Sequence, residues 1–142
     1  MRSILLTIFL FIGLSSYSQV DTAKLNSFIK EWWNVPYVLG GNSKNGLDCS
    51  RFTQRIYKEV FDKVIPNVSW KQWRVTKRVS KKDLQTGDLV FFRSKISPSG
   101  WHVGLYLWDN LFVHAANKKE DIKISSLNED NYRLNYKGAG RL

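Results

Sequence analysis

The feature that most constrains this chain is its single cysteine, Cys49, which stands where a glycine-rich loop (residues 40–46) gives way to a helical pattern. The apolar residues that follow recur every four positions: Phe52, Ile56, Val60 and Val64. This spacing predicts an amphipathic helix. Asp48 comes just before it, and a carboxylate there can accept hydrogen bonds from the free N–H groups of the first turn. The sequence therefore predicts a helix that is capped by Asp48 and begins at Cys49.

A thiol at the first position of a helix lies at the positive end of the helix dipole, which favours the thiolate over the thiol. On a helical wheel Cys49 shares a face with Phe52 and Ile56, so its sulfur should point toward the body of the protein. We therefore expect Cys49 to be an activated nucleophile whose pKa lies below the free value of about 8.5. The competing interpretation is a small buried hydrophobic residue.

The N-terminus has the composition of a secretory signal peptide. Arg2 supplies the positive charge, residues 4–14 are apolar apart from Thr7, and small residues precede position 19. The apolar run is too short for a membrane span. We expect cleavage after Ser18, export of residues 19–142 as a single domain, and no stable membrane span in the mature chain.

The charge of the chain is strongly positive, with a net value of +10 at neutral pH. Loss of Arg2 with the signal peptide leaves 21 basic residues against 12 acidic ones, or +9. Such a charge favours anionic surfaces. The basic residues are dispersed, with the densest stretch at 71–82, and no nucleic-acid-binding motif is present. We therefore expect no nucleic-acid partner, and the sequence leaves the oligomeric state open.

Helical patterns dominate the first half of the chain and strand patterns the second. A first helix is expected after Asp21 or Thr22, ending near Asn34 because Pro36 disfavours a helical residue before it. Residues 68–79 lack a clean period and suggest a loop or short helix. Strands are expected at residues 89–92, 101–107, 111–116, 119–125 and 136–142. This order predicts an α+β fold with helices packed on one side of an antiparallel sheet, which the last strand closes.

Both histidines of the chain, His102 and His114, fall on the hairpin predicted at 101–116. A three-residue loop at 108–110 places His114 opposite Gly104, so that the histidines share a face as diagonal neighbours about 7–8 Å apart. A two-residue loop would put them on opposite faces. Gly104 leaves room for an imidazole, and we predict the three-residue register.

A thiol and two paired imidazoles are the groups that nucleophilic catalysis at a carbonyl requires. Cys49 would attack, His102 would remove the thiol proton and return it to the leaving amine, and His114 would orient His102. The backbone N–H of Cys49 at the helix start could stabilise the oxyanion.

Five motifs in order resemble the NlpC/P60 family of papain-like cysteine peptidases. They are NVPYVLGG at 34–41, LDCSRF at 47–52, GDLVFF at 87–92, WHVGLYL at 101–107 and FVHA at 112–115. The resemblance implies a papain-like fold and a catalytic triad of Cys49, His102 and His114. It also implies hydrolysis of peptidoglycan stem peptides at the γ-D-glutamyl–diamino acid bond, without a cofactor or metal, by a protein of the periplasm or the cell wall.

The resemblance further suggests which residues bind the substrate. Tyr37 is expected near the nucleophile as a hydroxyl donor, and Asp48 and Ser50 are expected to line the substrate side, with Asp48 as a partner for a substrate amine. The family usually has glycine where this chain has Arg51. A long cation there could change access to the site or bind a carboxylate of the stem peptide.

Three other functions are compatible with the same residues. A Cys–His amidase or acyltransferase acting on another amide or on a lipid would use the same triad. Cys49, His102 and His114 could instead form a zinc site with one open position. A wall-binding protein without catalytic activity is the third alternative.

Overall fold

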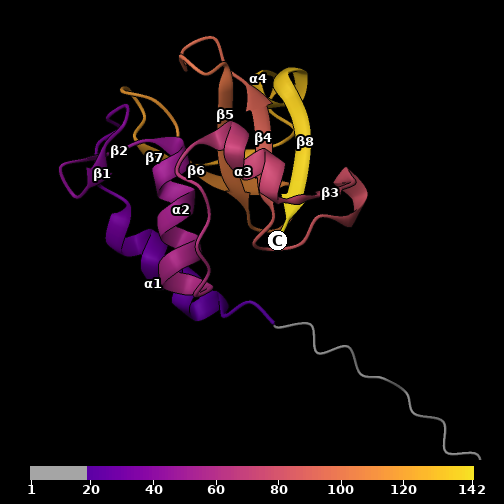
Figure 1. Ribbon diagram of the computed structural model, residues 1–142, viewed down its shortest axis with the longest axis horizontal. Coiled ribbons are helices and arrows are strands. Elements are labelled where there is room, and N and C mark those ends of the chain that lie inside the picture. Colours follow the sequence, from indigo (N-terminus) through magenta and orange to yellow (C-terminus); the bar gives the residue numbers. More distant parts are fainter. Residues whose placement is uncertain (1–18) are drawn as a thin grey trace, which may run out of the picture.

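The structure is a computed structural model that describes residues 19–142 (Figure 1), and the predicted signal peptide lies outside these residues. The helices are α1 (Thr22–Trp32), α2 (Cys49–Val60), α3 (Ser69–Val75) and α4 (Asp130–Asn135), with a 3₁₀ turn at Lys81–Asp83. The strands are β1 (Asn42–Ser43), β2 (Gly46–Leu47), β3 (Lys77–Val79), β4 (Leu89–Arg93), β5 (Trp101–Tyr106), β6 (Leu111–Ala115), β7 (Ile122–Ser126) and β8 (Tyr136–Arg141). These elements confirm the predicted α+β class.

The main sheet has six strands in the order β3-β8-β4-β5-β6-β7, and its neighbours pair antiparallel. The sequence suggested that the last strand closes the sheet. In the structure this strand, β8, is not at an edge but lies between β3 and β4. The stretch for which we expected a loop or short helix forms the short helix α3 and then edge strand β3, which the sequence did not predict. The small β1–β2 hairpin leads directly into α2.

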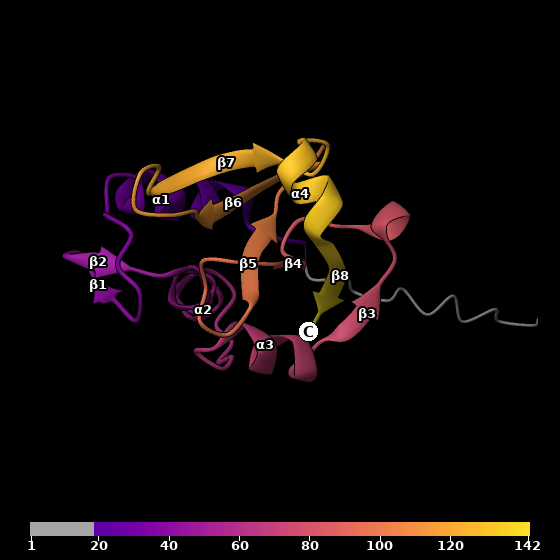
Figure 2. The ribbon, with the colours of Figure 1, turned by 90° about the horizontal axis from the view of Figure 1, so that it is seen from above.

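Both faces of the sheet are covered, which explains why β4 is apolar throughout. Leu89 and Phe91 pack with residues of α1 and α2, whereas Val90 and Phe92 pack with residues that include Tyr132 of α4. Figure 2 shows α2 along its axis beside β5, with α4 on the other side of that strand. The prediction of helices on one side is therefore incomplete, because it did not include α4.

The two long helices follow the predicted pattern closely. Asp21 caps α1 by accepting from the Lys24 N–H at 3.0 Å. Helix α2 buries its apolar stripe but ends at Val60, one turn earlier than predicted. Asp62 adopts a left-handed backbone with φ of 52°, and Val64 is 89% exposed. A left-handed residue after the last turn is a common helix stop, so Val64 is not part of the stripe.

Within residues 19–142, no helix is long and apolar enough to cross a membrane.

Candidate active site

Cys49 is the first residue of α2 and is 6% exposed. Asp48 caps the helix as predicted, because its Oδ1 accepts from the Arg51 N–H at 2.8 Å. The sulfur of Cys49 accepts a hydrogen bond from the backbone N–H of Val103 on β5. The helix start therefore directs the thiol to β5, immediately beside the position of His102.

The acidity of Cys49 differs from the prediction. Burial, followed by the negative charge of Asp48, raises the pKa of the Cys49 thiol to about 12, while the N–H groups of Val103, Ser50 and Cys49 itself lower it. The expectation of a pKa below that of a free cysteine is wrong for the resting protein, because desolvation and the adjacent carboxylate outweigh the helix start. The resting nucleophile is a thiol, and its proton must leave during the attack.

The two histidines pair as the sequence predicted. Leu105 lies opposite Val113 in the β5–β6 ladder, which is the register of a three-residue loop with Gly104 opposite His114. The His102 Nε2 and the His114 Nδ1 are 2.7 Å apart. A Cβ on Gly104 would lie 2.6 Å from the Phe112 ring and 3.2 Å from the Cβ of His114. Glycine at this position therefore leaves the room that the Phe112 ring and the adjacent His114 occupy.

Two residues that the sequence did not predict, Ser125 and Tyr132, contact the ring nitrogen of His114 that does not face His102. The His114 Nε2 lies 3.0 Å from the Ser125 hydroxyl on β7 and 3.4 Å from the Tyr132 hydroxyl on α4. Burial lowers the pKa of His102 to about 4 and that of His114 well below its usual range, so both rings are neutral. If His114 donates from Nε2 to Ser125, its Nδ1 accepts from His102, and the Nδ1 of His102 remains free as a base.

Tyr37 lies close to Cys49 and Asp48. Its backbone N–H donates to the Asp121 carboxylate at 2.9 Å, which fixes the segment before the glycine-rich loop. Burial, followed by the charges of Cys49 and Asp48, raises the pKa of the Tyr37 hydroxyl to about 12. The hydroxyl is therefore near both residues and stays protonated, as a donor must.

Asp48 is 8% exposed and already holds three donors. Besides the Arg51 N–H, it accepts from the Ser50 hydroxyl at 3.1 Å and from the Gly40 N–H at 2.8 Å. A carboxylate has about four lone-pair positions, so one further donor can be accommodated.

Ser50 and Arg51 both contact the loop after α2. The Ser50 hydroxyl is buried and lies 2.8 Å from the backbone oxygen of Asn67. The Arg51 guanidinium donates to Gln54 at 3.3 Å, and with the Asn67 amide oxygen turned toward it, to Asn67 at 2.8 and 2.9 Å. The fully buried Gln72 donates to the backbone oxygen of Ser50 at 2.9 Å. These contacts brace the helix start, and the substrate contacts expected of Ser50 and Arg51 remain predictions.

The geometry does not favour the zinc alternative. The two imidazoles direct ring nitrogens at each other across 2.7 Å, which is a hydrogen-bond distance and not the arrangement of two ligands that converge on an ion. In the part of the chain that the structure describes, no group of three histidine, cysteine or acidic residues is placed to hold a metal.

A cavity of about 310 Å³ opens beside His102. It lies between the β4–β5 loop, the segment after β6, and α4. Its lining residues are Phe92, Arg93, Ser94, Lys95, Ile96, His102, Ala116, Asn117, Asn131, Tyr132 and Asn135. Arg93 and Lys95 are the cations among them, and no acid contributes.

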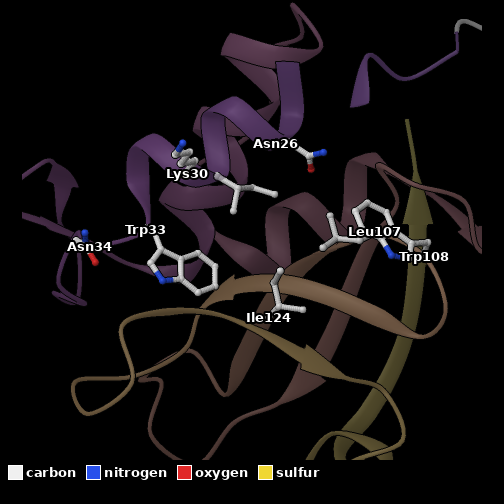
Figure 3. A pocket seen from close by; sticks show the side chains of 8 residues that line it. Asn26, Lys30, Trp33, Asn34, Leu107, Trp108 and Ile124 are labelled. Carbon is white, nitrogen blue, oxygen red and sulfur yellow. The ribbon is translucent and has the colours of Figure 1, made fainter. Parts of the chain in front are cut away.

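Another cavity, of about 460 Å³, lies between α1 and the β6–β7 side of the sheet. Figure 3 shows Trp33, Trp108 and Ile124 around this hollow, with Asn26 and Lys30 above it. Its eight lining residues include no histidine, cysteine or acid. It therefore contains none of the groups that the proposed chemistry uses.

Comparison with known proteins agrees with the fold. The chain is 43% identical over 112 residues to the murein DD-endopeptidase MepS/murein LD-carboxypeptidase of Escherichia coli (strain K12), covering 79% of this chain and 58% of that protein. It is 37% identical over 113 residues to a gamma-D-glutamyl-L-lysine dipeptidyl-peptidase of Bacillus cereus, covering 79% of this chain and 34% of the relative. The chain thus spans less than two thirds of these relatives.

A solved structure gives the same result. The crystal structure of an NlpC/P60 family protein from Bacillus cereus superposes with a TM-score of 0.74 at 35% identity, covering 84% of this chain and 39% of that one. The NlpC/P60 family pattern matches residues 34–141, which contain Cys49, His102 and His114. The chain belongs to the NlpC/P60 family.

Proposed function

We propose that this protein is an exported cysteine endopeptidase that hydrolyses amide bonds in the stem peptides of peptidoglycan. The observation that carries the proposal is the placement of the catalytic groups: the backbone N–H of Val103, the residue after His102, acts on the Cys49 sulfur, and the His102 Nε2 lies 2.7 Å from the His114 Nδ1. The names of the relatives, a murein endopeptidase and a gamma-D-glutamyl-L-lysine dipeptidyl-peptidase, support the choice of substrate.

The reaction begins from a neutral thiol and a neutral imidazole. As the Cys49 sulfur attacks the carbonyl carbon, its proton passes to the Nδ1 of His102, and the oxyanion accepts from the backbone N–H of Cys49. The imidazolium then gives the proton to the leaving amine as the C–N bond breaks. Water attacks the resulting thioester with His102 again as base, which releases the acid and restores the thiol.

The substrate-binding roles follow from the two ends of a stem peptide. Asp48 has room for one further donor beside the Tyr37 hydroxyl, and this position suits a free amine on the acyl side of the scissile bond. The Ser50 hydroxyl donates a hydrogen bond to Asp48 and so helps to fix its carboxylate. Arg51 lies beside the site as a cation for a stem carboxylate. We assign cleavage to the γ-D-glutamyl–diamino acid bond. The 43% identity to a protein named as a murein DD-endopeptidase makes the bond that such an enzyme cleaves the second candidate.

Residues 1–18 are proposed as the cleaved signal and residues 19–142 as the catalytic domain, located in the periplasm or at the cell wall. The net charge of +9 that remains would favour binding to an anionic wall.

The test uses purified stem peptides and the variant Cys49→Ala. Wild type should release two fragments whose masses identify the bond, and Cys49→Ala should release none, since no other group can form the thioester. His102→Ala should be nearly as inactive, because members of a catalytic unit act together.

The folded state of both variants is checked by circular dichroism and thermal unfolding. No new fragment from wild type, or the same fragment from Cys49→Ala, would contradict the proposal. Transfer of an acyl group to an added amine or lipid, without hydrolysis of the stem, would favour the amidase or acyltransferase alternative.

A further inference from the structure

The cavity beside His102 has a charge that the catalytic residues do not explain. Arg93 ends β4 and Lys95 lies two residues later in the β4–β5 loop, and both are exposed. Within residues 19–142 neither cation is in an ion pair, and no acidic residue lines the cavity. Two like charges at the mouth of one hollow are unfavourable unless an anion joins them.

Amide side chains complete the wall opposite these cations. Asn131 and Asn135 come from α4, and the Nδ2 of Asn135 donates to the backbone oxygen of Asn131 at 2.7 Å. The side-chain amide of Asn131 is exposed and has no hydrogen bond within the described part of the chain. The cavity thus offers cationic and neutral donors around a space of about 310 Å³, which is the size of a small-molecule site.

The position of the cavity relates it to one side of the scissile bond. His102 is part of the cavity wall and, in the proposed reaction, gives its proton to the leaving amine. The leaving residue must therefore lie within hydrogen-bond reach of His102. Asp48 and Tyr37 lie close to Cys49 and are not among the residues that line this cavity, so the acyl part of the substrate is assigned to them.

We propose that this cavity binds a free carboxylate on the leaving residue of the substrate, through Arg93 and Lys95. The inference rests on the proposed function and extends it, because it assigns a charge to the leaving group. Cation and carboxylate form charge-assisted hydrogen bonds, and arginine can bind a carboxylate through two parallel N–H groups. With Asp48 on the acyl side, the site has a carboxylate at one end and the cations Arg93 and Lys95 at the other. This difference in charge fixes the direction in which the peptide binds.

The chemical class that fits is a peptide whose leaving residue carries an unamidated carboxylate. A diamino acid meets this requirement when it carries a second carboxyl group or ends the peptide, because one amine then forms the scissile amide while a carboxylate remains free. The same requirement holds for either candidate bond, so the inference does not depend on the choice between them.

The test compares two synthetic stem peptides that differ only in the leaving residue, which ends in a carboxylate in one and in a carboxamide in the other. Wild type should cleave the carboxylate peptide with a kcat/KM about fivefold higher, the effect expected for a solvent-exposed ion pair. Arg93→Gln should reduce this ratio to near one, and Lys95→Gln should reduce it in part. Arg93→Lys keeps the charge without the paired N–H groups and should retain an intermediate ratio.

Lys82→Gln is the matched control, because it removes one exposed positive charge from the 3₁₀ turn, outside the cavity lining. Its ratio should equal that of wild type. Equal rates for both peptides in wild type, or a ratio unchanged in Arg93→Gln, would overturn the carboxylate site. Cleavage of the peptides would still support the proposed endopeptidase activity. If wild type cleaves neither peptide, the proposed function itself fails.

Discussion

Asp48 directly precedes Cys49, and Arg93 lines the cavity beside His102; the protein holds these two charged residues in opposite ways. Asp48 is 8% exposed and accepts three hydrogen bonds, whereas Arg93 is exposed at the end of β4. The buried frame, defined as Asp48, His114 and Ser125 with their hydrogen bonds, is in place before a substrate arrives. The basic wall is defined as Arg93 and Lys95, and its exposed side chains become ordered only when the ligand binds.

This difference indicates how each part contributes. A preorganised buried group acts at low local dielectric and needs no reorganisation during the reaction, so its loss should be severe. An exposed cation is screened by water and salt, so its loss should be mild. The frame should therefore set the rate and the stability, and the basic wall should set the preference among substrates.

The largest effect is expected from the frame residue nearest the base. His114→Ala should lower kcat roughly 10- to 10³-fold with little change in KM. His102 keeps its proton-accepting atom, but the tautomer and the orientation of its ring are no longer fixed. His114→Asn, whose amide oxygen can still accept from the His102 Nε2–H, should recover part of the loss. Steady-state kinetics on one stem peptide measure both.

A purely structural role for His114 would lower the amount of folded enzyme and leave kcat per folded molecule unchanged. Active-site titration of Cys49 separates the two cases. Ser125→Ala, which removes only the 3.0 Å contact behind His114, should cost less than His114→Ala. A larger loss in Ser125→Ala would show that the relay is wrongly assigned.

The second effect concerns stability. Asp48→Ala should destabilise the fold by about 3 kcal/mol, because the helix cap is lost and buried donors are left without an acceptor. Asp21→Ala is the matched control, since Asp21 caps α1 through one exposed bond of 3.0 Å and should cost about 1 kcal/mol. Urea unfolding monitored by tryptophan fluorescence gives both values. Equal losses would show that the burial of Asp48 adds nothing to an ordinary cap.

The contrast between the two parts also decides what the sequence could reveal. Helix α2 and its cap follow from spacing within a dozen residues, and the histidine pairing follows from one loop length, so these were predicted and confirmed. Ser125 and Tyr132 reach His114 only because β7 and α4 fold next to β6, which no local pattern encodes. The place of β8 between β3 and β4 was missed for the same reason.

The acidity of Cys49 was predicted in the wrong direction for a related reason. The helix start and the adjacent Asp48 are both visible in the sequence, but the burial of the thiol, which raises its pKa most, depends on how α2 packs against β5. Long-range packing, and not residue identity, determines the resting protonation state.

The third effect is the pH dependence of stability. The pKa of His102 in the folded protein is about 4, and that of His114 is also lowered, so the unfolded chain takes up protons first as the pH falls below about 6.5. The free energy of unfolding should therefore decrease as the pH falls from about 6.5 to about 4, by about 3 kcal/mol from His102, with a further decrease from His114. Urea unfolding at several pH values measures it.

Replacing the titrating ring provides the control for this dependence. In His114→Gln the slope over the same pH range should be smaller than in wild type, because one buried neutral imidazole is gone. A wild-type stability that is constant over this range would contradict the burial of His102 and His114 as neutral rings.

The smallest effect should come from salt, and it separates the two parts most directly. Raising the ionic strength from about 0.05 M to about 0.5 M shortens the Debye length to below the width of the cavity, so the preference for a leaving-group carboxylate should fall about twofold. The preference for a free amine over an acetylated one on the Asp48 side should change less, because a buried carboxylate is screened less. Rates on the two peptide pairs, measured in one salt series, test this. If both preferences decrease by the same factor as the salt concentration rises, the amine contacts Asp48 where solvent is present. The frame would then be no better shielded from salt than the basic wall.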